Sequence, residues 1–108
     1  MGRQFDLEAK IRFLSAEEGG RSKPVFSSYR PNHDFGVHDD YGLVDAVHEY
    51  VGTDHCDPGQ SVFAKLTFLN DQPVLRRLFP GQEFRVQEGA RIVAIGSISR
   101  LLRADLQA

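Results

Sequence analysis

Histidine and cysteine are the residue types in this chain that could hold a metal ion, and their spacing argues against it. The four histidines are His33, His38, His48 and His55, and the single cysteine is Cys56. On a strand, His33 and His38 would point to opposite faces because they are five residues apart. His55 and Cys56 are adjacent, without the CxxC or HxxxH spacing of a structural zinc site. We therefore interpret these residues as solvated loop residues and predict no metal site.

Catalytic constellations are equally poorly supported. A nucleophilic thiolate needs a positioned base and a cationic environment, whereas Asp54 and Asp57 flank Cys56 and would raise its pKa. No serine stands on a recognisable nucleophile elbow. The nearest approach to a phosphate-binding loop is Gly19-Gly20-Arg21-Ser22, which lacks the lysine of a P-loop. The sequence predicts that the protein is not an enzyme, has no cofactor and binds no nucleotide.

Composition sets the class of protein. The chain has 108 residues, of which 41% are hydrophobic and 26% charged, and its mass of 12.1 kDa leaves room for one core. A net charge of −2 excludes the chain as a whole from being an electrostatic nucleic-acid binder. No apolar run approaches the roughly 20 residues of a membrane helix, and one cysteine fits a reducing compartment. We expect one cytoplasmic domain, residues 1–108, without a membrane partner.

The elements that must position any site are short and extended. Residues 5–13 alternate strictly, which predicts a strand with Phe5, Leu7, Ile11 and Phe13 inside and Asp6, Glu8, Lys10 and Arg12 outside. Residues 43–50 suit either a helix or a strand, and residues 53–59 read as a loop. Further extended segments are expected at 25–31, 35–37, 62–68, 84–86 and 92–98, with turns at 39–42 and 87–90 and an apolar or helical tail beyond 98. Short strands joined by glycine and proline turns indicate an antiparallel barrel or sandwich.

Read together, the loops resemble a known family. The motifs are Glu17-Glu18-Gly19-Gly20-Arg21, Pro24, Tyr29-Arg30-Pro31, Pro58-Gly59 and Glu88-Gly89-Ala90-Arg91, followed by Ala94 and Gly96. In this order and at this spacing they resemble the C-terminal β-barrel, the third domain, of elongation factor Tu, from about Phe5 to Leu102. The resemblance implies an all-β fold, a compact six-stranded antiparallel β-barrel.

The resemblance also implies a function. In the family this barrel does no chemistry; it holds the T-arm backbone of aminoacyl-tRNA, packs on the GTPase domain and meets the nucleotide-exchange factor. The chain lacks that GTPase domain and the barrel before it, so we expect it to act alone or to supply a face to another protein. At most positions that face tRNA in the family, this chain carries a different residue; these are Asn32, Tyr41, Gln72, Gln87 and Ala90. Those that match are Glu88, Gly89 and Arg91.

Two function hypotheses remain open. The first is a non-catalytic binding module that contacts a protein, in translation or as a mimic of its machinery. The second is a tRNA binder for the acceptor and T-arm region, which the lost cations and the acidic stretch Asp34–Asp40 disfavour. The arginines could instead pair with Glu17, Glu18 or Glu88 across the loops. The candidate partner- or RNA-binding residues are Arg21, Tyr29, Arg30, Glu88, Gly89 and Arg91.

Overall fold

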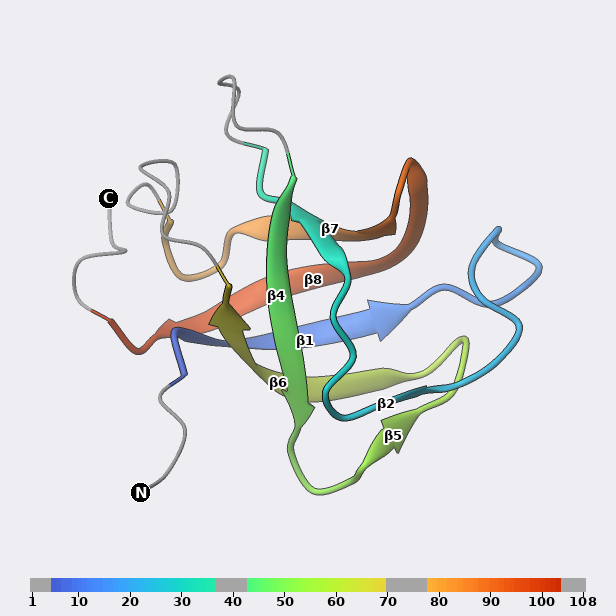
Figure 1. The fold of residues 1–108 in the computed structure, drawn as a ribbon, viewed down its shortest axis with the longest axis horizontal. Helices are drawn as coiled ribbons and strands as arrows, with labels where there is room; N and C mark the ends of the chain where they lie inside the picture. Colours follow the sequence, from blue (N-terminus) through green and yellow to red (C-terminus); the bar gives the residue numbers. More distant parts are fainter. Residues whose placement is uncertain (1–4, 37–42, 70–77, 104–108) are drawn as a thin grey trace.

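A closed barrel of six antiparallel strands forms the body of the protein in a computed structural model that describes residues 5–36, 43–69 and 78–103 (Figure 1). The described strands are β1 (Leu7–Phe13), β2 (Val25–Phe26), β3 (Asn32–Asp34), β4 (Val44–Tyr50), β5 (His55–Cys56), β6 (Ser61–Phe68), β7 (Glu83–Glu88) and β8 (Arg91–Leu101). The barrel order is β1-β6-β4-β3-β7-β8, with β8 returning to β1, and β2 pairs with β5 outside it. The predicted six-stranded antiparallel barrel is confirmed.

Strand β1 shows why the chain closes in this register. Leu7, Ala9, Ile11 and Phe13 are buried, while Lys10 and Arg12 are exposed. Because side chains alternate along a strand, this register places every apolar residue of β1 in the barrel interior. The predicted alternation is therefore confirmed for this strand.

Asp6, just before β1, was expected outside and is buried, with 7% of its surface exposed. Its carboxylate accepts hydrogen bonds from the Phe68 backbone N–H at 2.6 Å and from Arg103 at 3.0 Å. A buried carboxylate is tolerable when it is paired and hydrogen-bonded in this way. The prediction for Asp6 was wrong because its partners lie about 60 and 100 residues further along the chain.

The ambiguous segment 43–50 is a strand, so the helical alternative is wrong. Its residues 44, 46, 48 and 50 are buried. The expected loop 53–59 contains the two-residue strand β5, which pairs Cys56 with Val25, and the free cysteine is buried in this strand rather than solvated in a loop. The strand expected at 35–37 is replaced by β3, which spans Asn32–Asp34 and ends before Phe35. Val37 and the turn expected at 39–42 lie outside the described residues. At the C-terminus, the segment after 98 continues β8 to Leu101.

The largest correction concerns two histidines. His33 on β3 and His48 on β4 are 0% exposed, although they were interpreted as solvated loop residues. Their rings belong to an aromatic cluster inside the barrel, in which His33 stacks on Phe35 and His48 meets Tyr50 edge-on. The interior thus carries two histidine rings, whose polar nitrogen atoms hydrogen bonding must satisfy.

Candidate interaction site

Glu88, the last residue of β7, is where the loops singled out in the sequence meet. Its carboxylate accepts a hydrogen bond from the Tyr29 hydroxyl at 2.5 Å and an ion-paired one from the Arg21 guanidinium. The guanidinium also lies over the Tyr29 ring, 5.5 Å from its centroid, a cation–π geometry. We call Arg21, Tyr29, Glu88 and Arg91 the Glu88 cluster.

Tyr29 is held in place from beneath. Its ring packs against Phe13 and, edge-on, against His48, with centroids 6.3 and 5.6 Å apart. The His48 backbone N–H donates to the Tyr29 carbonyl at 2.8 Å. Burial, and then the carboxylate of Glu88 beside the hydroxyl, raise the pKa of Tyr29. The phenol therefore keeps its proton and remains a hydrogen-bond donor.

The ionisation of Glu88 is set by opposing effects. Partial burial acts to raise the pKa of its carboxyl, but the hydrogen bonds from Tyr29 and Arg21 together outweigh burial and leave that pKa below its ordinary value. Glu88 is consequently a carboxylate at neutral pH. A fixed negative charge thus stands at the centre of the Glu88 cluster.

Arg91, the first residue of β8, holds the glycine loop that follows β1. Its guanidinium donates to the Gly19 carbonyl at 3.1 Å and to the Gly20 carbonyl. Gly19 has a φ of +92°, which favours glycine. A Cβ on Gly20 would collide with the backbone of Leu14. The glycine pair is therefore required by the backbone geometry of this loop.

The remaining candidate residues are less engaged. Gly89 forms the turn between β7 and β8 with a φ of +62°, and its carbonyl accepts from the Gln87 side chain at 3.1 Å. The Arg30 side chain is exposed and makes no hydrogen bond or ion pair with any residue that the structure describes. Of the three acids considered as partners for the motif arginines, Glu88 pairs with Arg21, whereas Glu18 pairs with Arg12 at 3.1 Å. The structure brings the Glu88 cluster and Gly89 together and leaves Arg30 outside their contacts.

Comparison with known families agrees with this geometry. The family model of the elongation factor Tu C-terminal domain matches residues 3–102, which is nearly the whole chain. The chain belongs to this family. It is therefore a translation-factor-like module, in a family whose domain is a non-catalytic barrel.

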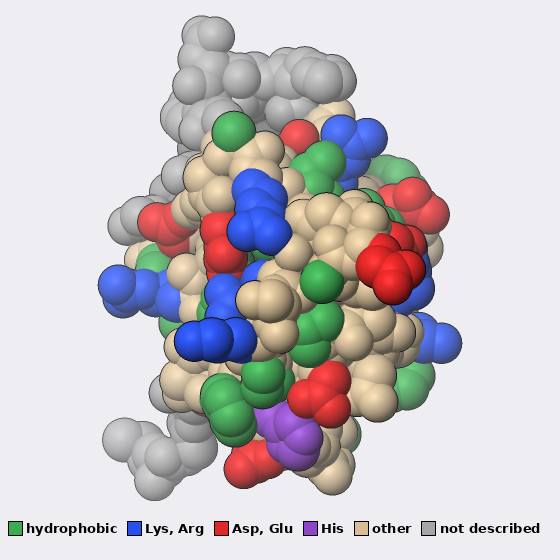
Figure 2. All heavy atoms as spheres, turned by 90° about the vertical axis from the view of Figure 1, so that its right-hand side faces the viewer, with side chains coloured by type: hydrophobic (Ala, Val, Ile, Leu, Met, Phe, Trp, Pro, Cys, Tyr) green, Lys and Arg blue, Asp and Glu red, His purple; other side chains and the backbone are tan. Residues whose placement is uncertain are grey.

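In this family member the Glu88 cluster borders a small hollow. Arg21, Ser22, Lys23, Glu88 and Arg91 line it, and its volume is about 160 Å³. Figure 2, which looks onto the right-hand side of Figure 1, shows Lys and Arg side chains beside Asp and Glu side chains on that face. The face is thus of mixed charge and not a continuous basic surface.

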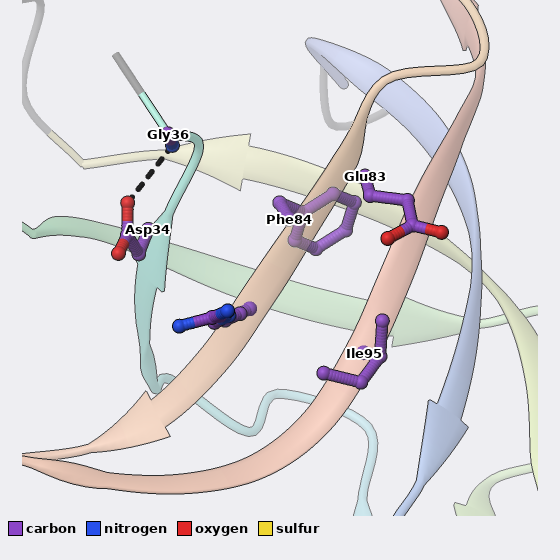
Figure 3. A pocket seen from close by; sticks show the side chains of 6 residues that line it. Asp34, Gly36, Glu83, Phe84 and Ile95 are labelled. Carbon is purple, nitrogen blue, oxygen red and sulfur yellow. Dashed lines mark hydrogen bonds between the residues drawn. The ribbon is translucent and has the colours of Figure 1, made fainter. Parts of the chain in front are cut away.

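Sequence reasoning missed a larger hollow, of about 470 Å³, outside strands β7 and β8. Figure 3 shows Asp34 on β3, Glu83 and Phe84 on β7 and Ile95 on β8 around it. Arg85 also lines it, and the Asp34 carboxylate accepts from the Gly36 backbone N–H at 2.8 Å. Nothing local in the sequence marks this hollow, because it exists only once β3 and β7 pair.

Two further classes of site were sought in the part of the chain that the structure describes. Within these residues, no group of three or more His, Cys, Asp or Glu side chains is arranged to hold a metal ion. The same residues include no helix with the length and hydropathy of a membrane span.

Proposed function

We propose that this chain is a single-domain, non-catalytic binding module that contacts a protein partner in the cytoplasm, as part of translation. The observation that carries the proposal is that both arginines of the Glu88 cluster are engaged inside the chain. Arg21 is paired with Glu88, and Arg91 is bound to the carbonyls of the glycine loop. Their first role is to staple three loops together.

The charge of the cluster supports a protein partner over RNA. A phosphate approaching Arg21 would meet the Glu88 carboxylate at hydrogen-bond distance from the same guanidinium. Nucleic-acid affinity depends on cations that are available to phosphates. A protein surface can match a mixed pattern of charge, and such matching provides specificity.

The alternative is the tRNA acceptor and T-arm, and one observation favours it. Arg30 and Lys23 are exposed near the Glu88 cluster in the chain, and Glu88, Gly89 and Arg91 match the family motif. Two exposed cations would supply few phosphate contacts, so binding would be weak and would depend only shallowly on salt. We therefore place this function second.

Site-specific photocrosslinking in the native host tests the proposal. A photoreactive amino acid replaces Ser22, which lines the hollow beside the Glu88 cluster, or Ser99, an exposed serine near the other end of β8. We expect a protease-sensitive, RNase-resistant adduct from position 22 and not from position 99. An RNase-sensitive adduct of tRNA size from position 22 would favour the alternative. The same adducts from both positions, or none from position 22, would contradict the proposed site.

A further inference from the structure

Two histidine rings face each other in the interior of the barrel. The Nε2 atoms of His33 and His48 are 2.7 Å apart, and both residues are 0% exposed. The other ring nitrogen of His33 lies 2.9 Å from the Val44 carbonyl oxygen. That of His48 lies 3.2 Å from the Tyr50 hydroxyl. The four groups form one continuous chain of hydrogen bonds.

The proton positions in this chain of hydrogen bonds follow from the groups at its two ends. A carbonyl oxygen only accepts, so His33 donates from Nδ1, and in a neutral ring its Nε2 must then accept. His48 therefore donates from Nε2 to His33. The Nδ1 of His48 accepts from the Tyr50 hydroxyl. With both rings neutral, every polar atom of the chain is satisfied in this single arrangement.

An additional proton disrupts the arrangement at either ring. A proton on Nε2 of His33 would point at the N–H of His48 across 2.7 Å. A proton on Nδ1 of His48 would point at a hydroxyl that now donates to it and would have to turn round. In both cases a positive charge would also be placed inside the barrel, away from water, which is costly.

The surroundings offer little to stabilise such a charge. The titratable side chains nearest the pair are Tyr29, Tyr50 and Asp45, and the Asp45 carboxylate accepts a hydrogen bond from Asn32. On β6 and β7 the residues opposite the pair are the buried, apolar Leu66 and Val86. Burial lowers the pKa of His33 to about 4, and burial followed by the neighbouring His33 lowers the pKa of His48.

The pair is coupled to the interaction site through Tyr29. The Tyr29 ring packs edge-on against His48, and their backbones share the 2.8 Å hydrogen bond from the His48 N–H. The Ser28 N–H also donates to the His48 carbonyl, at 2.7 Å. The Tyr29 hydroxyl reaches Glu88. A displacement of His48 is thereby transmitted to the centre of the Glu88 cluster.

We propose that the His33–His48 pair is an acid-sensitive latch, which closes the barrel when neutral and, when protonated, separates β3 from β4 and releases Tyr29 from Glu88. In an unfolded chain histidine titrates near 6.5. From about pH 6.5 down to about 4, the opened chain then binds more protons than the closed barrel. Stability is therefore complete above this window and is lost as the pH falls through it.

Urea unfolding between pH 7.5 and 4.5 tests the latch, with the wild type beside His33→Phe/His48→Leu. Below pH 6, the wild-type unfolding constant should rise by up to about 100-fold per pH unit, which is about tenfold for each histidine. The double variant should lose most of this slope, whatever its stability at pH 7.5. His55→Gln, which removes an exposed histidine paired with Asp54, is the matched control and should keep it. An unchanged slope in the double variant would overturn the proposal.

Nuclear magnetic resonance on the wild type keeps the latch testable if the double variant does not fold. At pH 7 the ring ¹⁵N shifts should show His33 protonated at Nδ1 and His48 at Nε2. Below pH 6 the amide protection factor of His48 should fall before that of Ile11, in the middle of β1. Ring shifts that titrate near 6.5 in an intact barrel, or equal loss of protection at both amides, would overturn the latch.

Discussion

Glu88 receives its two side-chain hydrogen bonds from residues 67 and 59 positions away in the sequence. The motif pattern indicated that an arginine could pair with Glu88 across the loops. It did not determine which arginine pairs with which partner, because side-chain geometry follows from the closed barrel. His33 and His48 were missed for another reason: histidine is intermediate in its tendency to be buried, so residue type alone did not place either ring inside the barrel.

Replacing Glu88 tests the cluster at the level of single residues. Glu88→Gln leaves the half-buried Arg21 without its counter-charge and weakens the acceptor of the Tyr29 hydroxyl. We expect a loss of about 1–2 kcal/mol in the free energy of unfolding, measured by urea denaturation at pH 7. Glu17→Gln, in an exposed position of the neighbouring loop, should change it by less than about 0.5 kcal/mol.

A double-mutant cycle tests the hydrogen bond between the Tyr29 hydroxyl and the Glu88 carboxylate. In the Glu88→Gln background, Tyr29→Phe should cost clearly less than in the wild type, because the hydroxyl has already lost its charged acceptor. Additive effects of the two substitutions would show that the hydrogen bond between Tyr29 and Glu88 does not contribute to stability.

At the scale of elements, strict alternation was the reliable signal. It predicted β1 and β6, whose buried residues recur with period two, whereas β8 was predicted from its β-branched residues and buries the adjacent Val93 and Ala94. On β4 the buried residues also alternate, and His48 has the same parity as Val44, Ala46 and Tyr50. Strand β5 could not be predicted, since a two-residue strand has no period and exists only through its pairing with β2.

Phe13, at the end of β1, is the element-scale test. It is 2% exposed and packs against Tyr29 and Tyr50, with ring centroids 6.3 and 6.4 Å away. Phe13→Ala should lower the free energy of unfolding by about 3–5 kcal/mol, since it leaves a cavity beneath the Glu88 cluster. Thermal or urea denaturation measures this loss.

The matched control is Phe63 on β6, another phenylalanine of the same barrel that is 57% exposed. Phe63→Ala should cost about 1 kcal/mol or less, including the loss of its contact with the Lys10 ammonium group. Equal losses for the two variants would contradict the assignment of the barrel interior.

At the scale of the whole molecule, the family motifs predicted the closed barrel, whereas strand periodicity alone left a barrel and a sandwich open. What closes the barrel is the pairing of β8 with both β1 and β7. Gly96 on β8 makes this closure possible, because a Cβ there would run into the ring of Phe84.

Nucleotide binding is a property of the whole chain that can be tested directly. The sequence has no P-loop lysine after its glycine pair, and the carbonyls of that pair are held by Arg91. We predict no binding of GTP with magnesium in isothermal titration calorimetry, and no hydrolysis. Affinity in the micromolar range or tighter would refute this prediction.

Titration of aminoacyl-tRNA at physiological salt tests most directly whether the Glu88 cluster serves a protein partner and not RNA. The wild type is compared with two variants that each reverse the charge of one side chain. Arg30→Glu changes an exposed cation, and Arg91→Glu changes a cation that is hydrogen-bonded to the carbonyls of the glycine loop. Because the cluster arginines are engaged internally and surround a carboxylate, we predict no saturation at physiological salt and only weak binding when the salt is diluted about tenfold. Tight binding at physiological salt that both variants abolish would contradict the protein-partner function and establish tRNA as the ligand.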